Sequence, residues 1–101
     1  MLSIIHLFGP IVFSANFAIC TDTSQQYYAT TIFANSQYYV FWADYRYYSS
    51  QGLYSLYGAR VTSAGTVLDP NGKLLFKRQA AYEPRVAFDG TNFLVAIRDS
   101  C

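Results

Sequence analysis

Residues 84–99 read Pro-Arg-Val-Ala-Phe-Asp-Gly-Thr-Asn-Phe-Leu-Val-Ala-Ile-Arg-Asp. Two short apolar runs in this stretch flank Asp89-Gly90-Thr91-Asn92, which is turn chemistry. Asp-Gly between two hydrophobic runs is among the strongest short-range signals for a β-hairpin. The stretch therefore predicts two antiparallel strands joined by a tight turn.

An earlier stretch, residues 29–44, carries the same pattern. A shift of 55 residues superimposes identical residues at four positions: Tyr27 on Tyr82, Phe33 on Phe88, Val40 on Val95 and Asp44 on Asp99. A repeat near this length is longer than most helical repeats and close to the range of propeller blades. We therefore expect one whole repeat, about residues 27–81, and the opening hairpin of a second, about residues 82–101.

The second strand of the first copy is apolar on both faces. Tyr38, Val40 and Trp42 share one face, and Tyr39 and Phe41 share the other, because successive side chains of a strand point to opposite sides. Such a strand is covered on both sides. Stacked sheets provide that cover, and the blades of a propeller are stacked sheets.

The rest of the chain also predicts strands and turns. A third strand is expected over residues 53–62, a turn over 69–72, a short edge strand over 74–76 and an exposed loop over 47–52. No window shows sustained helical periodicity with start and stop signals. The predicted fold class is therefore all-β, with antiparallel sheets of the propeller-blade type.

The first twenty residues differ in composition from the remainder. They contain no Lys, Arg, Asp or Glu, and their apolar run is interrupted by Gly9-Pro10. This resembles a secretory signal peptide cleaved after Cys20, with the small residue Ala18 three positions back. The alternatives are a buried N-terminal strand and a lipoprotein signal at Cys20, against which Ile19 stands where a small residue is usual. We predict a domain of residues 21–101 that is secreted or displayed at the cell surface, with no stable membrane span once the signal is removed.

Charge and cysteine content exclude several classes of partner and cofactor. The chain has seven Lys and Arg against six Asp and Glu, so no basic stripe is present and no nucleic-acid partner is predicted. Its two cysteines, Cys20 and Cys101, stand far apart and make no disulfide framework. No pair has metal-ligand spacing, and neither a metal site nor a cofactor is predicted.

Two segments carry a resemblance to a known family. Residues 56–72 read Leu-Tyr-Gly-Ala-Arg-Val-Thr-Ser-Ala-Gly-Thr-Val-Leu-Asp-Pro-Asn-Gly, and residues 84–95 follow with Pro-Arg-Val-Ala-Phe-Asp-Gly-Thr-Asn-Phe-Leu-Val. Together they resemble the tandem units of secreted bacterial proteins that read approximately IYGARV…GTVLDP.G and then P.VAFDGTNYLVVW.D. The resemblance covers about residues 29–99 and implies a β-propeller-type repeat of the cell surface. The chain departs from it in its repeat number and at Ala96-Ile97, which replace the usual aromatic strand end.

Three acids are the obvious candidates for chemistry. Asp44, Asp89 and Asp99 could pair as general acid and base. However, Asp89 lies in a turn where its side chain can bond its own backbone, and Asp44 and Asp99 end equivalent strands. A structural role is the preferred interpretation, and a calcium site lacks a dense group of oxygen ligands. The only histidine, His6, lies in the predicted signal, so no catalytic residue is predicted.

The remaining candidates are Arg60 and a group of tyrosines. Arg60 is interpreted as a surface or cross-strand charge, with an anchor at a blade edge as the functional alternative. Tyr45, Tyr47, Tyr48 and Tyr54 could present flat rings to a protein or a glycan. The preferred interpretation is that these rings cover a sheet edge or pack on the next repeat, because exposed aromatic patches are uncommon.

These observations predict a non-catalytic binding or structural module of an exported protein, a fragment of a larger propeller. Its predicted partners are further repeats or copies of itself, with a protein or glycan ligand as a further option. The rival hypothesis is a secreted propeller enzyme, a glycan hydrolase or lyase, whose active site lies in other repeats. A third is a truncated piece with no independent function.

Overall fold

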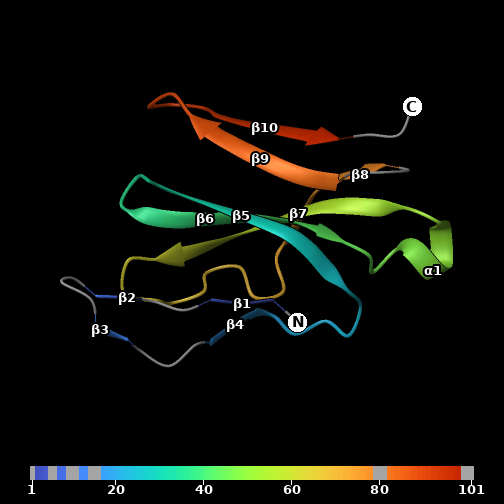
Figure 1. The fold of residues 1–101 in the computed structure, drawn as a ribbon, viewed down its shortest axis with the longest axis horizontal. Helices are drawn as coiled ribbons and strands as arrows, with labels where there is room; N and C mark the ends of the chain where they lie inside the picture. The colour runs from blue at the N-terminus through green and yellow to red at the C-terminus, as the bar shows by residue number, and fades with distance from the viewer. Residues whose placement is uncertain (1, 5–6, 9–11, 14–16, 79–81, 99–101) are drawn as a thin grey trace.

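Four consecutive strands form the main sheet of the protein (Figure 1). The computed structural model describes residues 2–4, 7–8, 12–13, 17–78 and 82–98. Within them the sheet has the order β5-β6-β7-β8, and each neighbouring pair is antiparallel. The strands are β5 (Gln26–Ala34), β6 (Gln37–Asp44), β7 (Tyr54–Thr62) and β8 (Lys73–Arg78). Each strand lies beside the one that follows it, so the sheet is a meander.

Smaller pairs of strands accompany this sheet. They are the hairpin of β9 (Tyr82–Phe88) and β10 (Phe93–Arg98), the pair β1 (Leu2–Ile4) and β4 (Phe17–Cys20), and the pair β2 (Leu7–Phe8) and β3 (Val12–Phe13). All are antiparallel, which confirms the predicted all-β, antiparallel class. The described residues close into neither a barrel nor a propeller. Among them no helix is long and apolar enough to cross a membrane.

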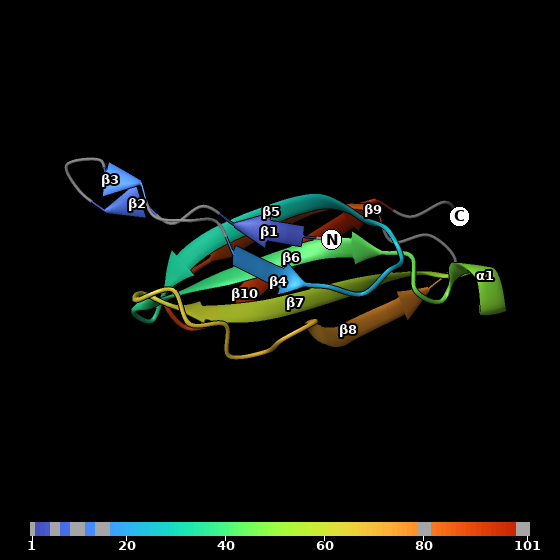
Figure 2. The same cartoon turned by 90° about the horizontal axis from the view of Figure 1, so that it is seen from below.

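One face of the sheet carries the main core. The buried cluster comprises Ile19, Cys20, Val40, Trp42, Tyr57, Ala59 and Val61. Trp42 and Cys20 are completely buried, and the Trp42 ring stacks on Tyr57 with 6.2 Å between ring centroids. Figure 2 shows β1 and β4 lying across this side of the sheet. The face of β6 that carries Trp42 is therefore covered by the N-terminal strands.

The predicted signal segment thus ends inside the folded structure. The Asn71 backbone N–H donates to the Ile19 carbonyl at 2.9 Å, and the Thr21 N–H donates to Asn71 Oδ1 at 2.8 Å. This arrangement is the one expected of a buried N-terminal strand, the alternative given above. Removal of residues 1–20 remains a prediction, and His6 and Gly9-Pro10 lie outside the described residues.

The opposite face of the sheet is covered by the β9–β10 hairpin. The Phe93 ring lies 4.4 Å from Tyr39 and 6.4 Å from Phe41, between centroids. Strand β9 packs most closely on β5, less on β6 and least on β7, and Figure 1 shows β9 between the sheet and β10. The predicted cover on both faces of β6 is therefore confirmed.

Turn residues place the strands as the sequence predicts. Gly90 has a φ of 104°, and the Asp89 carboxylate accepts hydrogen bonds from the Thr91 and Asn92 backbone N–H groups at 2.8 and 2.7 Å. Between β5 and β6, Asn35 and Ser36 have φ values of 51° and 62°. Two successive positive φ angles match the right-handed twist of the flanking strands. Both predicted hairpins are confirmed.

The predicted loop over residues 47–52 is wrong in one respect. Helix α1 (Tyr48–Gln51) forms a single turn there, and Gly52 ends it with a φ of 68°. The Gly52 N–H donates to the Tyr48 carbonyl at 2.7 Å, so the glycine provides a left-handed helix end. Four residues are too few to produce a helical period in the sequence, which explains the error.

Gly72, in the turn before β8, lies directly against the Trp42 ring of the core. Its φ is +76°, and a Cβ there would lie 2.5 Å from Trp42 Cη2. Gly52 has a similar φ of +68°, with nothing within 4 Å of the same position. Both Gly→Ala changes incur the left-handed penalty of about 1–2 kcal/mol. We expect Gly72→Ala to lower the free energy of unfolding by about 1–3 kcal/mol more, the usual cost of overpacking.

Urea unfolding followed by the fluorescence of Trp42, the only tryptophan, measures this difference at fixed protein concentration. Equal losses of stability in Gly72→Ala and Gly52→Ala would mean that the turn at Gly72 does not press on the Trp42 ring.

Candidate functional site

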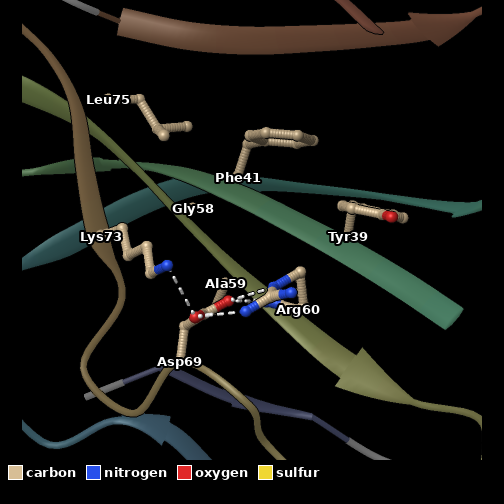
Figure 3. Close-up of a pocket in the computed structure, with 8 residues that line it drawn as sticks. All are labelled: Tyr39, Phe41, Gly58, Ala59, Arg60, Asp69, Lys73 and Leu75. Carbon is tan, nitrogen blue, oxygen red and sulfur yellow. Dashed lines mark hydrogen bonds and ion pairs between the residues drawn. The ribbon is translucent and has the colours of Figure 1, made fainter. Parts of the chain in front are cut away.

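A groove opens on the sheet face that carries the β9–β10 hairpin (Figure 3). Its volume is about 180 Å³. The residues lining it, here called the sheet groove, are Tyr39, Phe41, Gly58, Ala59, Arg60, Asp69, Lys73 and Leu75. They come from β6, β7, β8 and the connection before β8. Three adjacent strands and one turn therefore build it, and most of its floor is apolar.

Gly58 determines the shape of the groove floor. A Cβ at this position would lie 2.9 Å from Leu75 Cδ1 and 3.1 Å from Phe41 Cδ1. Only glycine lets the Phe41 and Leu75 side chains approach each other over β7, which accounts for a glycine inside a strand. In Figure 3 both side chains rise from the sheet toward the hairpin strand above it. Nothing in the sequence shows which side chains approach Gly58.

An ion pair forms the polar wall of the groove. The Arg60 backbone N–H and Nε both donate to Asp69 Oδ2 at 2.9 Å, and Nη2 donates to Oδ1 at 3.1 Å. Lys73 Nζ lies 3.5 Å from the same carboxylate. Hydrogen bonding from Arg60, with help from the Lys73 charge, lowers the pKa of Asp69 to about 2. An acid this strong stays ionised at neutral pH, so Asp69 fixes the turn and is unsuited to donate a proton there.

Tyr39 borders the same groove. Its hydroxyl accepts hydrogen bonds from Asn35 Nδ2 at 3.4 Å and Gln37 Nε2 at 2.9 Å. These bonds lower the pKa of Tyr39. Its ring faces the hairpin through Phe93, so it joins the groove to the interface between sheet and hairpin.

Two of the three candidate acids, Asp44 and Asp89, lie among the described residues, and both have structural roles. Asp44 is completely buried and accepts from Trp42 Nε1 at 2.9 Å and from Arg46 Nε at 2.8 Å. Asp89 is bonded within its own turn. Asp99 and Cys101 lie outside the described residues. The structure therefore shows Asp44 and Asp89 engaged locally, in agreement with the preferred interpretation of these two acids.

Arg46, which sequence reasoning did not single out, holds the Asp44 side of the core together. Its guanidinium lies 3.8 Å above the Tyr57 ring centroid, and Nη2 donates to the Asn71 carbonyl at 2.8 Å. Nη2 also lies 3.4 Å from Cys20 Sγ. Burial alone would lower the pKa of Arg46, but the hydrogen bonds and charge of Asp44 outweigh it and raise the pKa. The spacing of Trp42, Asp44 and Arg46 on alternate residues was the available signal.

Three of the four predicted surface tyrosines come together. Tyr45 lies 4.3 Å from Tyr54 and 6.0 Å from Tyr48, and Tyr48 stacks on Tyr54 at 5.0 Å, all between ring centroids. Tyr27 of β5 joins them, 4.9 Å from Tyr45. Tyr47 is separate, because it packs against the main core with Lys77 Nζ 4.6 Å above its ring. These rings pack on one another, whereas the preferred interpretation placed them on a sheet edge or on the next repeat. That placement and a ligand for the rings both remain predictions.

Arg60 lies on β7, within the predicted third strand, and pairs with Asp69. It is the partner of a buried acid, and its own side chain is 43% exposed. In the part of the chain that the structure describes, no group of three or more His, Cys, Asp or Glu side chains is placed to hold a metal ion. Comparisons with protein-family models, with curated proteins and with solved structures gave no match.

The Arg60–Asp69 pair makes stability depend on pH. Because the folded pKa of Asp69 is about 2, below its ordinary value of 3.8, the pair contributes fully above about pH 4. This contribution is lost as the pH falls toward 2, and it amounts to about 1–2 kcal/mol. Asp69→Asn should remove this pH-dependent contribution. The difference in free energy of unfolding between parent and variant should therefore be smaller at pH 2 than at pH 5.

Urea unfolding at pH 5 and at pH 2 in both proteins provides the measurement. Asp89→Asn is the comparison variant: backbone hydrogen bonds of its own turn also lower the pKa of Asp89, so this variant measures the acid sensitivity of an exposed carboxylate that has no ion-pair partner in its turn. A gap between parent and Asp69→Asn that stays constant with pH would contradict the assignment.

Proposed function

We propose that this protein is a non-catalytic repeat module, part of a propeller-type array of an exported or cell-surface protein. The observation that supports it most is the packing between repeat-equivalent elements. Phe93, which the 55-residue shift places on Tyr38, packs on Tyr39 and Phe41 of the preceding copy. The module thus stacks one copy of the repeat on the opposite face of the copy before it.

The way the hairpin approaches the sheet supports the propeller-type arrangement. Strand β9 is closest to β5, its equivalent in the repeat, and recedes from β6 and β7. Hairpin and sheet are therefore close along their first strands and separate toward the later ones. Blades arranged around a central axis approach each other in this manner.

The outer face of the hairpin remains available for a further unit. The repeat places Leu94 and Ala96 on Tyr39 and Phe41, the two residues that the hairpin covers in the first copy. Leu94 is 72% exposed, and Ala96 is also exposed. Apolar side chains on an open sheet face mark a surface for association, and the predicted partners are further repeats or second copies of this chain.

The rival function, part of a secreted propeller enzyme, rests on residues beyond this chain. The engaged states of Asp44, Asp69 and Asp89 favour the non-catalytic module. Export continues to rest on the charge-free apolar start of the chain.

Association through the hairpin face gives a direct test. We expect the full chain to be oligomeric in size-exclusion chromatography with light scattering at micromolar concentration. Leu94→Lys should raise the concentration needed for association at least tenfold, because the contact would bury a charge. Leu68→Lys is the control, since Leu68 is also exposed (42%) and belongs to the connection before β8, not to the hairpin.

Reductant is included throughout, because the chain contains two cysteines. A parent chain that stays monomeric at 100 times the working concentration would contradict the stacking function. Equal effects of Leu94→Lys and Leu68→Lys would contradict it as well.

A further inference from the structure

We propose that the sheet groove binds a small aromatic carboxylate, with the ring on the apolar floor and the carboxylate at the end that carries Arg60 and Lys73. The proposal is independent of stacking between repeats, because the groove is lined by β6, β7, β8 and the connection before β8 and not by the hairpin. Three features carry it: the charge at one end of the groove, the size of the floor and the spacing between the two.

One end of the groove carries an excess of positive charge. Asp69 is the single acid among the described residues that line the groove, and it faces two cations, Arg60 and Lys73. The Asp69 side chain is only 6% exposed, whereas those of Arg60 and Lys73 are 43% and 66% exposed. The negative charge is therefore buried while the positive groups face solvent, so this end of the groove attracts an anion.

The Arg60 guanidinium retains donors for a second carboxylate. Its Nε and Nη2 each donate one hydrogen bond to Asp69, and a guanidinium carries five N–H groups. The bond from Arg60 to a ligand carboxylate is charge-assisted, which is the stronger kind of hydrogen bond. Because Asp69 already fixes the guanidinium, a ligand pays little to order it.

The apolar floor has room for one ring. Leu75 is 50% exposed, and its Cδ1 would lie 2.9 Å from a Cβ at Gly58, so the missing side chain keeps the floor low. An apolar cavity of about 150 Å³ holds one benzene molecule, and the groove has a volume of about 180 Å³. Figure 3 shows Phe41 and Leu75 at one end of the groove and the charged side chains at the other.

The strand geometry sets the distance between ring and charge. On β7, Gly58 marks the apolar floor and Arg60 the charged end, two residues further along the same face. Two residues span about 6.6 Å along a strand. A ligand therefore needs a short linker between its ring and its carboxylate. The linker of 3-phenylpropionate meets this need, whereas benzoate has no linker.

Saturation-transfer NMR on the full chain measures the affinity for 3-phenylpropionate, for benzoate and for the neutral analogue 3-phenylpropan-1-ol. We expect saturable binding of 3-phenylpropionate with a Kd of about 1 mM, because the ligand is small. Benzoate and the alcohol should each bind about fivefold more weakly, the scale of one exposed ionic contact. No saturable binding of 3-phenylpropionate, or an equal affinity for either comparison compound, would overturn the proposal.

Two pairs of variants locate the site. Lys73→Met removes the excess charge, so it should reduce the affinity for 3-phenylpropionate to that for the alcohol. Lys77→Met is the matched control, because Lys77 lies on the same strand with its Nζ over the Tyr47 ring and does not line the groove. Leu75→Ala should weaken both ligands, whereas Leu74→Ala, at a position 43% exposed and outside the groove, should weaken neither. Equal effects within either pair would contradict the assignment.

A last comparison separates a free acid from the end of a peptide chain. An acetylated tetrapeptide that ends in phenylalanine presents the same ring and carboxylate. It should bind no more tightly than 3-phenylpropionate, because a groove of about 180 Å³ accommodates little beyond the ring and linker. Clearly tighter binding of the peptide would overturn the assignment of a free small acid.

Discussion

Strand β6 must be covered on both faces, and the rest of the structure follows from this requirement. Trp42 and Val40 are buried on one face of β6, and Phe41 is buried on the other. One additional layer packed on the sheet would cover only one of these faces, so two layers are needed. The protein meets the requirement with two separate segments, the N-terminal strands on the Trp42 side and the β9–β10 hairpin on the Phe41 side. Burial of a large apolar side chain is worth about 1.5–3 kcal/mol, so loss of either cover would expose a substantial part of the core.

Two ion pairs hold the connections around this core in place. Asp44 receives the Trp42 indole N–H and the Arg46 guanidinium, and Arg46 reaches across to the Asn71 carbonyl. Asp69 receives the backbone and side chain of Arg60. A buried charge whose partner is removed costs about 3–5 kcal/mol. Asp44 therefore holds the end of β6 in place through Arg46, and Asp69 holds the connection before β8 against Arg60 of β7.

Local features of the fold could be predicted from the sequence, and contacts between distant residues could not. Asp89-Gly90 and the alternating faces of β6 act within a few residues, so turn chemistry and strand period identify them. The Arg60–Asp69 pair depends on how the connection between β7 and β8 folds back. Likewise, nothing local separates Tyr47 from Tyr45 and Tyr48, because the turn of α1 decides which ring faces the core. The groove was not predictable either, since it requires three strands and the connection before β8 together.

The unequal covering of the two faces gives the module a direction. On one side, Cys20 and Ile19 seal the Trp42 face from within the chain. On the other, Leu94 leaves the outermost face open. A contact between unlike faces is heterologous and propagates head to tail. A stack of the proposed kind would therefore be polar, because Ile19 and Cys20 seal one of its two outer faces and Leu94 lies exposed on the other.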